Sequence, residues 1–204
     1  MTASVQSPAD VVNLALRRIG YRLRVGSLYD GSEAAKKALD IYGQTRDALL
    51  RAGDWGFAER NVPMNLLKSA PPGGYTPPLT WTSAYPPLGW LFEYTYPTDC
   101  LRVRAVKGTS IFTPNFDPQP NVFSEENDNS FSPPRKVILC NVPAAILVYT
   151  GQVTDPATWE ADFVEALAAG LARRLAASLA SADFVKLEGG DEQTEAMVAA
   201  SEQG

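Results

Sequence analysis

The chain has 204 residues, of which 45% are apolar and 20% charged, with a formal net charge of −5, and this composition is typical of a globular protein. No window approaches the roughly 20 apolar residues that cross a bilayer, and the N-terminal segment lacks a basic start followed by an apolar core. These patterns argue against a membrane-spanning chain and a secretory signal, so we expect the protein to stay in the cytoplasm where it is made.

The sequence contains no histidine, which removes the usual general base near neutral pH and the commonest metal ligand. Cys100 and Cys140 have no CxxC spacing and lie in apolar, strand-like contexts, so we interpret both as buried small hydrophobic residues. We therefore expect no catalytic residues, no cofactor and no metal. Chemistry based on a carboxylate pair or a lysine stays open, although acidic residues spread along helix faces are more often solvated.

Charge is unevenly distributed along the chain. Residues 1–68 hold ten Lys and Arg against seven Asp and Glu, whereas residues 69–204 hold eight against sixteen. The pI of about 4.8 argues against a broad nucleic-acid-binding surface, because phosphate neutralisation needs clustered Lys and Arg.

The N-terminal segment predicts a helix over 8–19, with Ser7 as N-cap, Pro8 at the first position and Gly20 at the end. Basic residues cluster where this helix ends, which we interpret first as complementing the helix dipole, with contact to an acidic partner as the alternative. The cluster consists of Arg17, Arg18, Arg22 and Arg24.

A second, long amphipathic helix is predicted to begin near Asp30, which forms a capping-box pattern with Glu33, and to run to Gly53. Trp55 and Phe57 follow directly and can fold back over the end of this helix. We interpret the segment as a fixed corner between packed elements.

Two proline-rich stretches, 69–88 and 113–134, are predicted to be exposed loops or arms, because proline fixes the backbone and donates no hydrogen bond. Their aromatic side chains are unusual in a solvated linker, so contact with another chain and packing on the protein's own sheet are both open. The candidate subunit or tail contacts are Tyr75, Trp81, Tyr85, Phe116 and Phe123.

Four short runs rich in β-branched and aromatic residues predict a small antiparallel sheet. They lie at 90–96, 101–106, 137–140 and 145–150. Asp99 follows the first run beside a proline, where an aspartate more often accepts hydrogen bonds from the local backbone than acts as a catalytic acid.

Asp155 and Pro156 give an N-cap and a first-position proline to the strongest predicted helix, which continues to about 182 with Gly170 as its one breaker. Large apolar side chains recur every four residues among alanines, which predicts a core helix or one packed between subunits. The stripe consists of Trp159, Phe163, Leu167, Leu171, Leu175 and Leu179. A final acidic segment over 191–201 predicts a short helix that is ordered chiefly against a partner.

Together these elements predict an α+β fold: an antiparallel helical bundle built from the N- and C-terminal helices, with a small antiparallel β-sheet and long loops inserted between them. The helical body would comprise 1–68 and 151–204. The inserted β-sheet region would comprise 69–150, with extended loops over 69–88 and 113–134.

Four phrases of the sequence, in this order, resemble the tail tubular protein A family, the head-to-tail adaptor proteins of tailed bacteriophages with short tails. They are ALRRIGYRLRVGSLYDGSEAAKKAL at 15–39, YGQTRDALLRAGDWGFAERN at 42–61, YTYPTDCLRV at 94–103 and YTGQVTDPATWEADFVEALAAGLARRLA at 149–176. The resemblance covers most of the chain, except for the two proline-rich stretches and the acidic end. None of the phrases is a catalytic signature.

The resemblance implies a non-enzymatic virion protein whose copies form a ring, expected to be a dodecamer, beneath the portal protein. Tail or nozzle proteins would attach below it, and DNA would pass through its channel without specific binding; no membrane partner is expected. Our hypothesis for the portal contact is the acidic end, with Glu188, Asp191, Glu192, Met197 and Val198. The side chains expected to hold the helices to the body as structural pins are Trp55, Phe57, Trp159 and Phe163.

Two other functional classes stay open. A small helical DNA-binding regulator would need a recognition helix with clustered basic and amide side chains, and the arginine cluster is short and terminal for that purpose. A carboxylate-based cell-wall hydrolase would need two converging carboxyl groups, for which Glu59 and Asp99 are the candidates.

Overall fold

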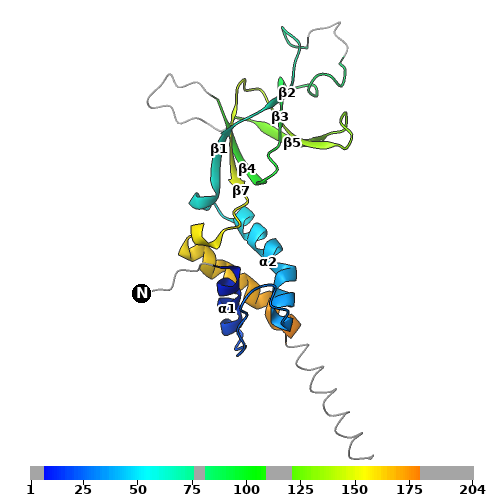
Figure 1. The fold of residues 1–204 in the computed structure, drawn as a ribbon. Helices are drawn as coiled ribbons and strands as arrows, with labels where there is room; N and C mark the ends of the chain where they lie inside the picture. The colour runs from blue at the N-terminus through cyan, green and yellow to red at the C-terminus, as the bar shows by residue number, and fades with distance from the viewer. Residues whose placement is uncertain (1–6, 76–80, 109–120, 180–204) are drawn as a thin grey trace, which may run out of the picture. The chain divides into compact units, whose positions relative to one another are not determined.

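The fold is given by a computed structural model that describes residues 7–75, 81–108 and 121–179. Internal contacts divide the chain into two compact units (Figure 1). The helical unit comprises Met1–Leu49 and Thr154–Gly204, and the β unit comprises Leu50–Val153. Phe116 and the whole predicted portal-contact segment lie outside the described residues.

The helical unit begins with α1 (Pro8–Arg18), which confirms the predicted helix and its start. The Ser7 hydroxyl accepts from the backbone N–H of Asp10, and the Asp10 carboxylate accepts from the backbone N–H of Ser7 at 3.0 Å, which completes a capping box. In the last turn, Arg18 forms an ion pair with Glu165 of the C-terminal helix. This contact links the two ends of the helical unit.

Helix α2 (Glu33–Ala52) starts differently from the prediction, because its N-cap is Ser32. The Ser32 hydroxyl accepts from the backbone N–H of Ala35 at 3.2 Å, as an N-cap side chain does. Asp30 instead closes the preceding loop, where its carboxylate accepts from the backbone N–H groups of Gly26 and Ser32. Hydrogen bonds from Ser32, first from its hydroxyl, lower the pKa of Asp30 to about 2.

The C-terminal helix is helical over 161–179, drawn in orange in Figure 1. It follows the short helix η2 (Pro156–Thr158), where the Asp155 carboxylate caps the backbone N–H of Ala157. All six side chains of the predicted apolar stripe are buried, which confirms the stripe as the core-facing side. A Cβ added at Gly170 would lie 3.2 Å from Cγ2 of Thr45, so this glycine permits a close approach to α2.

Seven strands in the β unit form two antiparallel sheets, in the orders β1-β7-β4 and β2-β3-β6-β5. The strands are β1 (Glu59–Pro63), β2 (Leu66–Ser69), β3 (Phe92–Thr95), β4 (Cys100–Lys107), β5 (Phe123–Asp128), β6 (Arg135–Cys140) and β7 (Ile146–Gly151). One face of each sheet contributes to a shared apolar core. Its buried members are Tyr94, Val103, Val106, Ile138, Cys140, Ala145, Leu147 and Tyr149. Both cysteines are free, with Cys140 buried and Cys100 half-buried.

The predicted fold class, a helical bundle carrying a small sheet, is therefore wrong. The described residues form three α-helices and two sheets, which together contain seven strands. The four predicted strands are present as β3, β4, β6 and β7. No strand was predicted at β1 or β2, and β5 lies inside the stretch 113–134 that was predicted to be an arm. These three strands are mostly polar or exposed and lack an apolar alternation, so pairing with a neighbour decides their conformation.

The corner after α2 places the Trp55 ring against Gly53. In the sequence, Trp55 and Phe57 flank Gly56, the first residue of η1 (Gly56–Ala58). Their ring centroids lie 6.3 Å apart. The backbone oxygen of Trp55 accepts from Nη2 of Arg104 at 3.2 Å, which attaches the corner to β4.

We expect Gly53→Ala to lower the free energy of unfolding by about 1 to 2 kcal/mol, because its Cβ overlaps the indole. That Cβ would lie 2.6 Å from Nε1 and 2.8 Å from Cε2 of Trp55, so the ring has to move. Gly43→Ala is the matched control, since nothing lies within 4 Å of its Cβ and alanine favours a helix interior by about 1 kcal/mol. Urea denaturation of both variants checks the prediction, and equal changes would contradict it.

Candidate binding site

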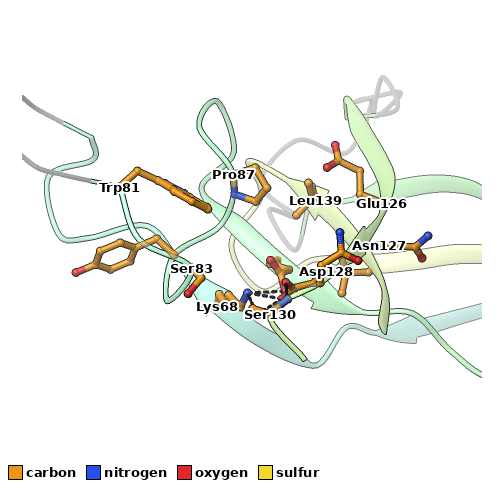
Figure 2. A pocket seen from close by; sticks show the side chains of 13 residues that line it. Lys68, Trp81, Ser83, Pro87, Glu126, Asn127, Asp128, Ser130 and Leu139 are labelled. Atoms are coloured by element: carbon orange, nitrogen blue, oxygen red, sulfur yellow. Dashed lines mark hydrogen bonds and ion pairs between the residues drawn. The ribbon is translucent and has the colours of Figure 1, made fainter. Parts of the chain in front are cut away.

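A cavity of about 440 Å³ lies over the outer face of the four-stranded sheet. The sheet contributes Lys68 and Glu93 to its lining, with Asp128 at the end of β5. Trp81 and Pro87 line it from the aromatic loop, defined as residues 70–75 and 81–91. We call it the Glu93 cavity. Figure 2 shows Trp81 and Pro87 on one side of this cavity and Asp128 on the other.

Strand register explains why these charged side chains share one face. Lys68 on β2 pairs with Glu93 on β3, and Glu93 pairs with Leu139 on β6, so the three side chains form one row. Because side chains alternate along a strand, Phe92 and Tyr94 on either side of Glu93 point to the opposite face, where they join the apolar core. The sheet therefore separates the core from the cavity.

Lys68 is the basic centre of the cavity. Its ammonium group forms an ion pair with Asp128, lies 3.6 Å from Oε1 of Glu93 and donates to Oγ of Ser130 at 2.9 Å. The same group lies 5.3 Å from the centroid of the Phe131 ring. One lysine therefore faces two carboxyl groups that lie in the same row of the sheet or at its edge.

Glu93 is 1% exposed, and its Oε1 atom has no hydrogen-bond partner among the described residues. Burial, followed by the neighbouring Asp128, raises the pKa of Glu93 to about 7. Burial would also raise the pKa of Asp128, but hydrogen bonds from Lys68 and Ser130 outweigh it and lower the pKa to about 2. At neutral pH Asp128 is thus ionised, whereas Glu93 beside it is protonated in part of the molecules.

The aromatic loop is held by its own backbone. The Tyr75 hydroxyl and the Trp81 Nε1–H both donate to the carbonyl oxygen of Pro86, at 2.5 and 2.8 Å. Tyr75 also meets Tyr85 edge to face, with ring centroids 6.4 Å apart. Trp81 nevertheless stays 44% exposed, so its ring is accessible from solvent.

Three other sequence-predicted residues of the described part do not line the cavity. Phe123 is half-buried and packs against the core from β5. Trp159 and Phe163 meet edge to face in the helical unit, with ring centroids 5.1 Å apart.

The structure does not bring together the two carboxyl groups considered for hydrolysis. Asp99 accepts from the Tyr149 hydroxyl at 3.0 Å and pairs with Arg60 at 3.3 Å. Glu59 pairs with Arg104 at 2.9 Å. Because Glu59 and Arg60 are neighbours in β1, their side chains point to opposite faces of the sheet, and each carboxylate is held by a different arginine.

Sequence reasoning did not single out Lys68, Glu93 or Asp128. One signal was available for Glu93, because a glutamate between two aromatic residues in an apolar strand is expected to have a buried partner. No such signal marks Lys68, which stands between Leu67 and Ser69, or Asp128, whose neighbours in sequence are polar.

The cavity offers acceptor oxygens, one ammonium group and an exposed indole, which suits binding of a cationic, hydrogen-bond-donating group. The described residues contain no group of three or more His, Cys, Asp or Glu side chains placed to hold a metal ion. Within the same part of the chain, no helix is long and apolar enough to cross a membrane. Searches with this sequence find no matching family model and no matching curated protein.

Proposed function

We propose that the chain is a structural subunit of the head-to-tail adaptor ring of a short-tailed bacteriophage. In this proposal its copies form a ring, expected to be a dodecamer, that joins the portal protein to the tail or nozzle proteins in the virion. The genome passes through the ring without specific binding. The four sequence phrases that resemble the tail tubular protein A family suggest this role.

The observation that carries the proposal is the exposure of large apolar side chains on two loops. Leu23 is 70% exposed and Tyr29 81% exposed in the loop 20–31 of the helical unit. In the β unit, the aromatic loop exposes Trp81, Leu88 and Leu91 in the same way. Such side chains gain about 25 cal/mol per Å² when they are buried, so an assembly stabilises what a single copy leaves in water.

Two further features support an assembly role over a hydrolytic one. Glu59 and Asp99 are each held by an arginine in the β unit rather than placed together around a substrate. The acidic balance of the chain also suits a channel, because a surface of net negative charge does not retain DNA. Repetition around an axis multiplies modest contacts, so weak individual interfaces are sufficient for a stable ring.

Negative-stain electron microscopy of the purified chain, alone and mixed with the portal protein of the same phage, tests the proposal. We expect rings that stack on the portal ring, with the portal alone as the control. An unchanged portal, together with a chain that stays monomeric at every concentration, would contradict an adaptor role.

A further inference from the structure

We propose that the Glu93 cavity binds a guanidinium group carried by the loop 20–31 of a second copy of the chain. This inference rests on the proposed function, since it describes how one subunit holds the next. The contact is between two different surfaces, so it runs head to tail around the assembly.

The cavity contains more acceptor groups than its own side chains satisfy. Oε1 of Glu93 is buried, lines the cavity and has no hydrogen-bond donor among the described residues. Glu126 lies on the cavity wall, on the same face of β5 as Asp128, and accepts from the Ser124 hydroxyl. No basic side chain of the described residues lies within ion-pair distance of Glu126. Three carboxyl groups thus line a cavity that holds a single lysine, and the buried Oε1 of Glu93 has the Lys68 ammonium at 3.6 Å but no hydrogen bond.

A guanidinium group fits this arrangement better than other common groups. It carries five donors in a planar fork, so one group can donate to Oε1 of Glu93 and still have donors left for a second acceptor of the cavity wall. Its flat face stacks on an indole, and Trp81 presents an exposed ring at the cavity. The volume of about 440 Å³ falls in the range of ligand pockets and admits a long side chain with its neighbours.

The loop 20–31 is the matching surface on the same chain. Arg22 and Arg24 are exposed, and no carboxylate of the described residues lies within ion-pair distance of either. Leu23 lies between them and is 70% exposed. The basic loop belongs to residues 1–68, which have excess positive charge, and the carboxyl groups of the cavity belong to residues 69–204, which have excess negative charge. Charge and apolar exposure therefore complement each other between copies.

The loop is also held in shape before it meets a partner. Asn13 bonds both backbone groups of Val25, and Asp30 accepts from the backbone of Gly26 and Ser32. A loop fixed in this way loses little conformational entropy on docking. Because loop and cavity are different surfaces, repeated contacts close into a ring when the rotation between copies allows it.

Charge reversal on each side, followed by both together, tests the contact by sedimentation velocity. The loop variant is Arg22→Glu with Arg24→Glu, and the cavity variant is Glu126→Lys. Controls reverse charges outside the contact: Lys36→Glu on α2, and Glu125→Lys, the neighbour of Glu126 whose side chain pairs with Lys136 on the other face of the sheet. Circular dichroism confirms that each variant is folded.

We expect the loop and cavity variants each to self-associate at least about tenfold more weakly than the wild-type chain, because like charges then meet in the contact. The chain that carries both reversals regains association, and both controls associate as the wild type does. An equimolar mixture of the loop variant and the cavity variant is expected to regain association, since both contacts between unlike variants then join opposite charges.

Wild-type-like association of both single-site variants overturns the inference, as does a wild-type chain that stays monomeric up to about 0.5 mM, near the weak end of specific affinities. The two proposals fail separately. Rings that form on the portal and ignore these charge reversals would remove the docking contact and leave the adaptor role. Association that follows the charges, without any binding to the portal, would do the reverse.

Discussion

Glu93→Gln is expected to stabilise the β unit at pH 8 by about 2 to 3 kcal/mol, whereas at pH 5 the difference from the wild type falls to about 1 kcal/mol or less. The fold raises the pKa of this carboxyl from 4.5 to about 7. A raised carboxyl pKa means that the folded state favours the protonated form of Glu93. The contribution of Glu93 to the free energy of unfolding is therefore fully present below pH 4.5 and is lost as pH rises towards 7. Each pKa unit corresponds to about 1.4 kcal/mol, and glutamine resembles the protonated acid at every pH.

Urea denaturation between pH 5 and pH 8 measures this difference. The range stays above the region in which Asp128, with its pKa lowered from 3.8 to about 2, costs stability as pH falls. Lys68 keeps its ion pair with Asp128 in the variant, so no new unpaired charge is left in the cavity. Glu126→Gln removes the same charge from an exposed position in the same cavity, and we expect it to change stability by less than about 0.5 kcal/mol. Parallel pH profiles for wild type and Glu93→Gln would show that Glu93 is not a buried acid.

Asn13→Ala is expected to lower the free energy of unfolding of the helical unit by about 2 to 4 kcal/mol. The Asn13 Nδ2–H donates to the carbonyl oxygen of Val25 at 2.8 Å, and its Oδ1 accepts from the backbone N–H of Val25 at 2.9 Å. Both side chains are buried, so alanine leaves one donor and one acceptor without partners, at about 1 to 3 kcal/mol each.

Thermal and urea denaturation of Asn13→Ala provide the measurement, with Gln44→Ala at an exposed position of α2 as the control. The control is expected to change stability by less than about 0.5 kcal/mol. A small loss of stability for Asn13→Ala would contradict the prediction. It would mean that water replaces both hydrogen bonds and that Asn13 does not fix the loop 20–31. The same variant should also weaken self-association, because the loop then loses the shape in which Arg22 and Arg24 are presented.

Local patterns were sufficient for the helices but not for their every boundary. Ser7 and Pro8 mark the start of α1 because an N-cap and a first-position proline act within one turn of the chain. The spacing of Phe163 and Leu167 in the apolar stripe identifies the buried face for the same reason. At α2 both Asp30 and Ser32 are suitable N-cap residues. The path of the preceding loop places Ser32, and not Asp30, at the N-cap position.

Strands that lack an apolar alternation were not predicted from the sequence. Because these strands were missed, the predicted fold class was wrong. The residues of β5, FSEEND, have the composition of a polar loop. They form a strand because β6 supplies hydrogen-bond partners along the whole segment. Likewise β1 is largely exposed and exists through its pairing with β7. A strand of this kind is specified by its neighbour, and the neighbour lies far away in the sequence.

The composition class, α1, the buried stripe of the C-terminal helix and the four apolar strands were predictable from the sequence, because each follows from residues that are close along the chain. The candidate site was not predictable in this way, because it depends on how the strands pair. Lys68, Glu93 and Asp128 come from β2, β3 and β5, and strand register brings them to one face. Burial then separates the pKa values of the two acids, and burial is a property of the packed sheet and its loop that no single segment carries.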